Sequence, residues 1–340
     1  MSTTATDLLR DPGAGPTPHT ADAAEIAARS PRQLFWRRLR RDRLALLALG
    51  VVVLIVLAAI LVPLIVDVAG APDPEKQNPD LTGSFGEPFG PRQRASSPLA
   101  DGTVPQAGIF GVDKLGRDVF ARTVFGARIS LLVAFVATAI TVLVGVTAGL
   151  LAGYYRGWLD TALTRTMDLM LAFPVLVLAI GIGVACSGPQ GCLGGLLQPG
   201  LTVVIFVISL ATWPYMARIV RGQVLSLREK EFVEAARSLG ASDRRILFKE
   251  ILPNLVAPII VYATVLVPQN ILFEAALSFL GVGVQDPRPS LGSMISDATQ
   301  NFDTSWWFLF FPGVALVLLV LAFNLIGDGL QDALNPKTSK

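Results

Sequence analysis

The sequence predicts an all-α integral membrane protein with six transmembrane helices and with its N- and C-termini in the cytoplasm. Hydrophobic residues make up 52% of the 340 residues, charged residues only 16%, and the mean hydropathy is +0.57. A soluble domain has nearer a quarter of charged residues. The apolar residues gather in runs of about 20, which is the length that spans a bilayer. The net charge of +2 predicts no nucleic-acid partner.

The N-terminal region predicts a polar tail followed by a first span. Residues 1–30 are rich in Ala, Thr and Pro and lack apolar periodicity, which is typical of a disordered cytoplasmic tail. This tail holds the only histidine, His19, so histidine-based catalysis, metal binding and proton relays are excluded from the membrane part. Residues 31–66 combine an arginine cluster with the apolar run Leu44–Val66, which is too long for a signal peptide and predicts a first transmembrane helix with its basic end inside.

Residues 67–127 predict an extracytoplasmic loop with an amphipathic segment. The first part of the loop is rich in Pro and Gly. The last part, Ile109–Leu132, predicts a short helix that Asp113 caps and that carries Arg117 and Arg122 on its polar side. Two interpretations stay open: an interfacial helix that shields the bundle, and a scoop for substrate entry or receptor docking.

Five further apolar runs predict a core of residues 128–330 with five transmembrane helices. The segment 218–249, between the fourth and fifth spans, holds eight Lys and Arg, and the segment 186–200, between the third and fourth spans, holds none. The positive-inside rule therefore places 218–249 in the cytoplasm and 186–200 outside. Residues 331–340 then form a cytoplasmic tail. The runs are Ile129–Gly153, Met167–Ala185, Leu201–Ile219, Leu255–Leu280 and Trp306–Ile326.

The cytoplasmic connection 220–254 predicts a helix, a turn and a second helix. Its density of charge excludes it from hydrocarbon. Gly240 stands where the first helix is expected to stop, and Ser242 or Asp243 would cap the second helix, which runs up to Pro253. A solvated loop is one interpretation. An apolar stripe at helical spacing favours a second one, docking onto a partner, because no soluble domain surrounds the helix. The stripe consists of Phe232, Ala235, Ala236 and Leu239.

This connection also resembles the EAA loop of type I ABC importer permeases. The similarity lies in Glu234-Ala235-Ala236, in Gly240 and in Leu252-Pro253, whereas Glu250 stands where that family has an apolar residue. Further segments are similar to the C-type permease of dipeptide and oligopeptide (peptide/nickel) importers. These are LGRD and GARISLL within 109–132, Tyr154–Pro174, Glu274–Pro287 and Trp306–Pro336.

The resemblance implies a type I ABC importer permease fold and a permease subunit of an ATP-driven importer for dipeptides or oligopeptides in the bacterial plasma (inner) membrane. The subunit would form half of the translocation path. Its implied partners are a homologous B-type permease, two ATPase subunits, an extracytoplasmic substrate-binding protein and membrane lipid. The coupling residues implied by the EAA loop are Phe232, Glu234, Ala235, Ala236, Arg237, Leu239, Gly240, Ala241, Leu252 and Pro253.

The sequence predicts no catalytic or metal site and no cofactor in this chain. It lacks the G-x-x-x-x-G-K-[ST] stretch that cradles nucleotide phosphates, so ATP and Mg would bind the partner subunits and the chain would be a transport subunit rather than an enzyme. A competing class is an ion-coupled secondary transporter, which needs ionisable residues near the midplane.

Three polar residues of the fifth span are candidates for a substrate path: Gln269, Asn270 and Glu274. Such residues are costly in a membrane and often functional. The other interpretation is that Glu274 only hydrogen-bonds a neighbouring helix. Outside the membrane, Cys186 and Cys192 predict either a disulfide or free thiols. Glycines four residues apart, at 145, 149 and 153, predict close helix packing.

Overall fold

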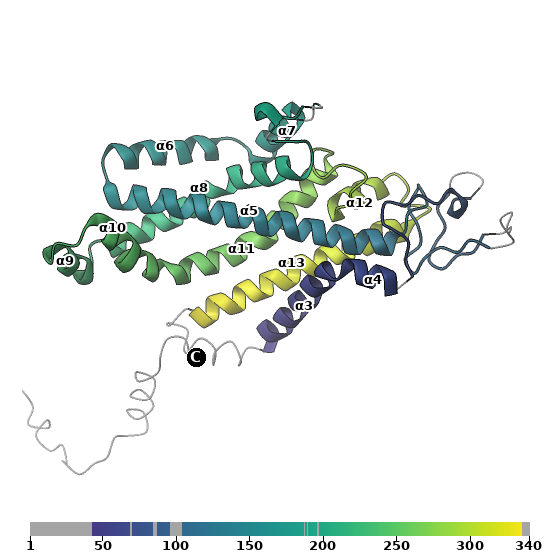
Figure 1. Ribbon diagram of the computed structural model, residues 1–340, viewed down its shortest axis with the longest axis horizontal. Helices are drawn as coiled ribbons and strands as arrows, with labels where there is room; N and C mark the ends of the chain where they lie inside the picture. Colours follow the sequence, from purple (N-terminus) through teal and green to yellow (C-terminus); the bar gives the residue numbers. More distant parts are fainter. Residues whose placement is uncertain are drawn as a thin grey trace, which may run out of the picture.

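A computed structural model describes residues 43–68, 70–83, 87–95, 104–186, 188, 190–195 and 197–334, and the predicted tail of residues 1–30 lies outside this range. The described part is helical apart from short isolated β-bridges in the outer loops (Figure 1). The α-helices are α3 (Arg43–Ile60), α4 (Val62–Val68), α5 (Val119–Tyr155), α6 (Trp158–Ala172), α7 (Val175–Ala185), α8 (Leu201–Leu227), α9 (Glu231–Ser238), α10 (Asp243–Arg245), α11 (Leu252–Phe279), α12 (Leu291–Ala298) and α13 (Trp306–Leu334).

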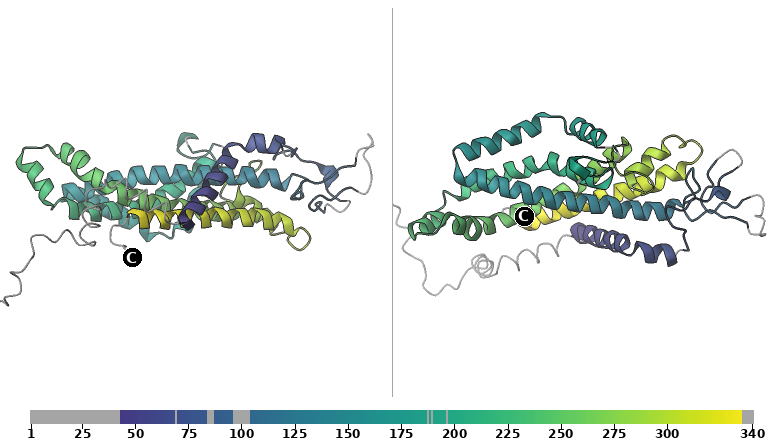
Figure 2. Two further views of the ribbon diagram at one scale, coloured as in Figure 1. Left: turned by 90° about the horizontal axis from the view of Figure 1, so that it is seen from below. Right: turned by 45° about the horizontal axis from the view of Figure 1, so that its top comes forward.

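Four helical segments among the described residues are long and apolar enough to cross a membrane, and two bent helix pairs pass the same test. The straight segments contain α5, α8, α11 and α13, and the bent pairs are α3 with α4 and α6 with α7. Counting each pair as one span gives six, in agreement with the sequence prediction. The long helices lie side by side along the molecule, and α3 packs beside α13 on the side away from α6 (Figures 1 and 2).

The predicted third span, Met167–Ala185, is not one straight helix. It breaks at Phe173 and Pro174, where α6 and α7 meet at 86°. The residue before a proline avoids the helical region, and Phe173 is extended with φ −86° and ψ 135°. The first span bends by 79° between α3 and α4, next to Pro63, whose missing N–H weakens the helix there.

Helix α5 begins at an earlier residue, and with a different N-cap residue, than the sequence predicts. It runs unbroken from Val119, so there is no separate amphipathic helix before the second span. Asp118, and not Asp113, is the N-cap, and its carboxylate accepts a hydrogen bond from the N–H of Ala121 at 2.8 Å. Asp113 lies buried in the preceding loop.

Close packing of α5 on α8 explains the glycines at four-residue spacing. A Cβ at Gly145 would lie 2.6 Å from Cβ of Met216, one at Gly149 2.7 Å from Cβ of Val220, and one at Gly153 2.7 Å from Cβ of Val224. These distances are too short for real carbon atoms, so the two backbones approach only because the glycines lack side chains. The predicted packing role is confirmed.

Candidate functional site

The connection between α8 and α11 forms a projecting elbow at one end of the molecule, which we define as residues 231–252. Figure 1 shows it at the left-hand end, opposite the outer loops. Helix α9 ends at Ser238, and Gly240 turns the chain with φ +78°, a conformation that favours glycine. The chain then continues through α10 and the π-helix Ile246–Ile251 directly into α11. The sequence predicts that the second helix runs up to Pro253. In the structure this helix continues past Pro253 as α11.

The inner face of the elbow anchors it to the bundle. Val233 of α9 is fully buried and packs in one cluster with Ile246 and Ile251 of the second helix. The bundle contributes Val220 and Val224 of α8 and Leu150 of α5 to the same cluster. Sequence reasoning missed Val233, although its spacing to Ala236, which is partly buried against the same cluster, marks a second apolar stripe on α9.

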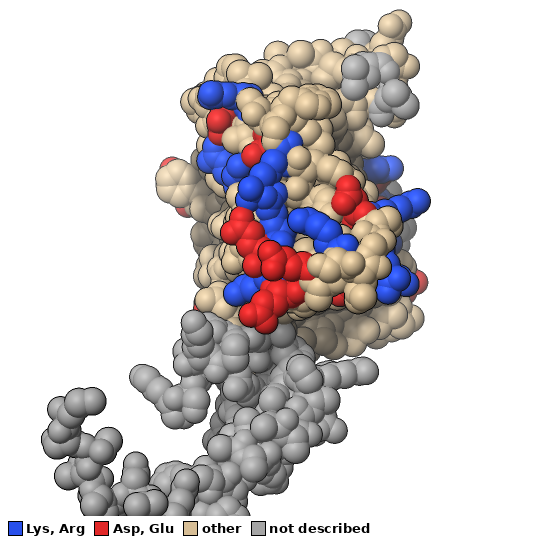
Figure 3. Space-filling model, turned by 90° about the vertical axis from the view of Figure 1, so that its left-hand side faces the viewer, with Lys and Arg blue, Asp and Glu red and all other residues tan. Residues whose placement is uncertain are grey.

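The outer face of the elbow exposes large apolar side chains outside the apolar bundle. Phe232 is 39% exposed, Leu239 88% and Phe248 57%. Phe248 was not among the predicted residues. Lys, Arg, Asp and Glu surround this face at the end of the molecule shown in Figure 3. Among the other predicted coupling residues, Glu234, Ala235, Arg237, Gly240 and Pro253 are exposed, while Ala236, Ala241 and Leu252 are half-buried.

Polar contacts fix the elbow and its neighbours to the end of α5. The hydroxyl of Tyr154 donates to Asp243 Oδ1 at 2.7 Å. At the end of α8, Arg228 Nη1 donates to the carbonyls of Gly153 and Tyr154, each at 3.0 Å, and so satisfies carbonyls that the end of a helix leaves free. The elbow is thus held by α5 and α8 as well as by α11, into which it runs.

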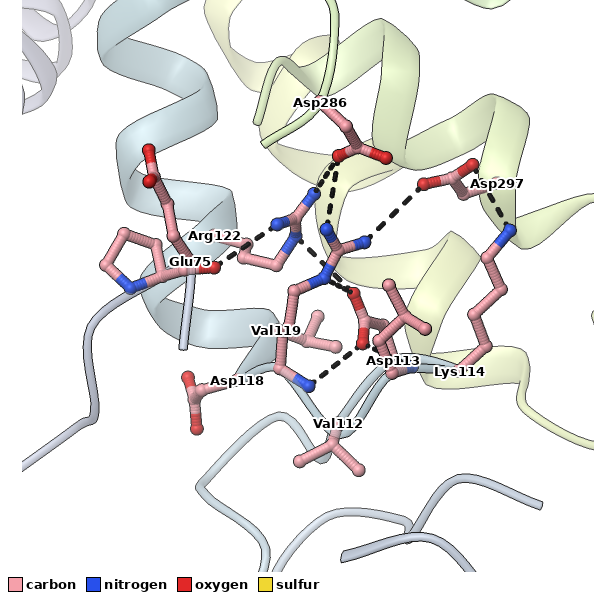
Figure 4. Close-up of polar contacts among 12 residues, drawn as sticks. Glu75, Val112, Asp113, Lys114, Asp118, Val119, Arg122, Asp286 and Asp297 are labelled. Carbon is pink, nitrogen blue, oxygen red and sulfur yellow. Dashed lines mark hydrogen bonds and ion pairs between the residues drawn. The ribbon is translucent and has the colours of Figure 1, made fainter. Parts of the chain in front are cut away.

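The opposite end of the molecule contains an ionic cluster around two buried arginines (Figure 4). Arg117 Nε lies 2.6 Å from Asp113 Oδ2, and Arg122 Nε lies 3.6 Å from the same oxygen. Both arginines also reach Asp286, at 3.1 and 3.5 Å, and Arg117 reaches Asp297 of α12 at 3.8 Å. The cluster joins the loop before α5 to the loop after α11. The expectation that both arginines lie on a polar outer side is wrong, because both are buried.

Asp118 lies next to this cluster and is also buried. Burial raises the pKa of its carboxyl above the ordinary value, and the nearby charge of Asp113 acts in the same direction, although hydrogen bonds from the backbone N–H groups of Ala121 and Phe120 oppose the shift.

The three candidate path residues of α11 do not share one face. Asn270 and Glu274 are fully buried against α5: Asn270 Nδ2 donates to Thr138 Oγ1 at 2.9 Å, and Glu274 accepts from Ser130 Oγ at 2.5 Å. Ser278 Oγ of α11 also donates to Glu274, at 2.7 Å. Glu274 therefore bonds a neighbouring helix, the second of the two interpretations. Gln269 is exposed on another side of α11.

Two further predicted features lie outside the elbow. Cys186 and Cys192 form a disulfide with their Cα atoms 4.9 Å apart, in the loop between α7 and α8. Among the residues that the structure describes, no group of three or more His, Cys, Asp or Glu side chains is arranged to hold a metal ion.

These features define a multi-span membrane protein with a charged, partly apolar elbow at one end. Residues 145–340 match the family described as binding-protein-dependent transport system inner membrane component, and residues 30–85 match the N-terminal TM domain of oligopeptide transport permease C. The chain therefore belongs to the family of inner membrane components of binding-protein-dependent transport systems, and it is a multi-pass transport permease of the inner membrane.

Individual relatives are similar over nearly the whole chain. The chain is 41% identical over 313 residues to the dipeptide transport system permease protein DppC of Alkalihalophilus pseudofirmus, covering 92% of each. It is 40% identical over 309 residues to the glutathione transport system permease protein GsiD of Escherichia coli, covering 91% of each. A chain of the MetNI methionine ABC transporter, solved in an inward-facing conformation, matches with a TM-score of 0.52 at 20% identity, covering 64% of this chain and 96% of that chain. This likeness confirms the type I importer permease fold.

Proposed function

We propose that this chain is the permease subunit of an ATP-driven importer for dipeptides or oligopeptides and forms half of the translocation path. The substrate class follows the names of its relatives, which include dipeptide and glutathione permeases. Its partners are a homologous permease, two cytoplasmic ATPase subunits, which bind ATP and Mg, and an extracytoplasmic substrate-binding protein.

The single observation that carries this proposal is the outer face of the elbow. Leu239 and Phe248 stay exposed on a segment whose other side is anchored by Val233. Burial of such apolar side chains favours association with a partner, and their position on short helices fits a groove that receives a helix. A rigid anchor lets the partner move the bundle instead of only bending a loop. ATP-driven closure of the ATPases would then shift the spans between outward and inward access.

Reconstitution tests the proposal. The permease pair, the ATPase subunits and the binding protein are placed in proteoliposomes, and uptake of a labelled dipeptide is measured with ATP or with an imposed ion gradient. Uptake that requires ATP and the ATPase subunits supports the importer. Uptake by this chain alone, driven by the ion gradient, contradicts it and favours a secondary transporter.

A further inference from the structure

Three polar side chains project from two of the long helices, α8 and α11. Tyr215 of α8 and Gln269 of α11 are exposed, and Tyr262 of α11 is half-buried. Each lies at least ten residues, roughly 15 Å of helix, from either end of its helix. Tyr262 and Gln269 are seven residues, about two turns, apart on one side of α11, and Tyr215 lies on α8, which packs against α11.

None of these three side chains makes a hydrogen bond within the part of the chain that the structure describes. A phenol or carboxamide without a partner is costly in hydrocarbon, where no water replaces the lost hydrogen bond. Polar groups at membrane depth therefore face protein or a water-filled cavity.

Helix α5 carries the contrasting kind of exposed surface, one that suits hydrocarbon. Its exposed residues between 131 and 145 are all apolar, and Leu143, the most exposed of the large ones, is 70% exposed. The contrast separates two outward surfaces of the same bundle. We define the polar face as Tyr215, Tyr262 and Gln269, and the lipid face as the exposed side of α5.

We propose that the polar face is a water-exposed wall of the translocation path and that it binds amide groups of a peptide through neutral hydrogen bonds. The inference rests on the proposed function. A phenol donates and accepts, and a carboxamide does both at once, so these groups match a peptide backbone. The nearest charge on α8, Arg218, is one turn away and is paired with Asp168 of α6. Arg218 is therefore neutralised within this chain and does not face a peptide as an unpaired charge.

Thiol accessibility tests the wall directly, because both native cysteines are held in the disulfide. Gln269→Cys and Tyr215→Cys are labelled in proteoliposomes of the assembled transporter with a charged methanethiosulfonate reagent on both sides. The matched controls are Leu143→Cys on the lipid face and Asn270→Cys, the buried neighbour of Gln269. An apolar environment raises the pKa of a thiol, and each unit of that increase lowers the fraction of reactive thiolate about tenfold. We therefore expect the thiols at positions 269 and 215 to be labelled at least about tenfold faster than those at positions 143 and 270.

Labelling of Gln269→Cys and Tyr215→Cys as slow as that of Leu143→Cys would overturn the proposal. Oxidative cross-linking of either position to the second permease would also overturn it, because the face would then be a subunit interface. Labelling needs no ATP. Fast labelling combined with ATP-independent uptake would thus support the water-exposed wall and contradict the ATP-driven function.

Discussion

The hydroxyl of Tyr154, at the end of α5, donates a 2.7 Å hydrogen bond to Asp243, at the start of the second helix of the elbow. This bond connects α5 to a segment that is otherwise continuous with α11. Movement of the elbow would therefore reach two spans that lie side by side, and α5 packs along α8 through its glycines. We infer that α5, as well as α11, transmits the motion of the ATPases.

Replacing Tyr154 by Phe tests this connection. The change keeps the ring but removes a hydrogen bond to a carboxylate, worth about 1.5–3 kcal/mol. We expect less peptide imported per ATP hydrolysed, at unchanged subunit abundance. Tyr155→Phe is the control, because Tyr155 is exposed and its hydroxyl makes no hydrogen bond among the described residues. An unchanged ratio of uptake to hydrolysis in Tyr154→Phe would show that α5 does not follow the elbow.

The outer face of the elbow should determine ATPase binding. Leu239→Ser and Phe248→Ser each remove an apolar side chain whose burial is worth about 1.5–3 kcal/mol, which is roughly a 10- to 150-fold loss of affinity. The measurement is recovery of ATPase subunits on the purified permease. Trp158→Ser, at an 80% exposed site at the start of α6, should leave recovery unchanged. Full recovery in both elbow variants would place the ATPase elsewhere.

Gly240 should be needed for its backbone conformation and not for space. Its φ is +78°, and no atom lies within 4 Å of an added Cβ. Gly240→Val should strain the turn by about 1–2 kcal/mol and uncouple uptake from ATP hydrolysis while the subunit still inserts. Gly240→Asn should retain more coupled uptake, because asparagine tolerates positive φ. Wild-type uptake by Gly240→Val would count against the assignment.

The contact of α5 with α8 should not tolerate even one added carbon. Gly149→Ala places its Cβ 2.6 Å from the carbonyl oxygen of Ala217, and we expect a loss of about 1–3 kcal/mol in stability, measured as a lower thermal unfolding midpoint. Gly222→Ala on α8 is the control, since nothing lies within 4 Å of its added carbon. Equal midpoints for the two variants would mean that the helices separate without cost.

The outer ionic cluster should stabilise the chain through its buried members. Arg117→Ala leaves the carboxylate of Asp113 buried without its closest partner and should cost about 3–5 kcal/mol, again read from the unfolding midpoint. Lys114→Ala removes a partly exposed pair with Asp297 and should cost at most about 1 kcal/mol.

A double variant, Asp113→Leu with Arg117→Met, should be more stable than Arg117→Ala, because it removes both members of the closest buried pair, while Arg122, which also loses Asp113, keeps Asp286 at 3.5 Å. A double variant that is less stable than the single one would mean that the cluster contributes more than charge compensation.

Local pattern predicted the spans and the turn at Gly240, but it did not predict which charges are buried. Arg117 and Arg122 looked solvent-exposed because only one of their partners, Asp113, is near in sequence: Asp286, which both arginines also reach, is 169 residues from Arg117. Only folding brings these groups together. The pKa shift of Asp118 also depends on such burial.

The sequence also does not show which prolines break a helix. The span breaks at Pro174 but α8 and α11 continue through Pro214, Pro258 and Pro268. Packing against neighbouring helices can hold a helix together across a proline, and sequence alone does not show which prolines have that support. Packing against neighbouring helices also decides which side of α9 faces inward, so the sequence pattern indicated an apolar stripe on α9 but not its direction. Val233 faces the bundle, while Phe232 and Leu239 face outward.

A photo-reactive amino acid at position 239, with position 143 on the exposed side of α5 as the control, tests whether the outer face of the elbow binds the ATPase. In an assembled particle that imports peptide, we predict that position 239 cross-links to an ATPase subunit and that position 143 does not. Absence of a cross-link from position 239 to the ATPase, in a particle that transports with ATP, would show that the elbow is not the ATPase-binding segment.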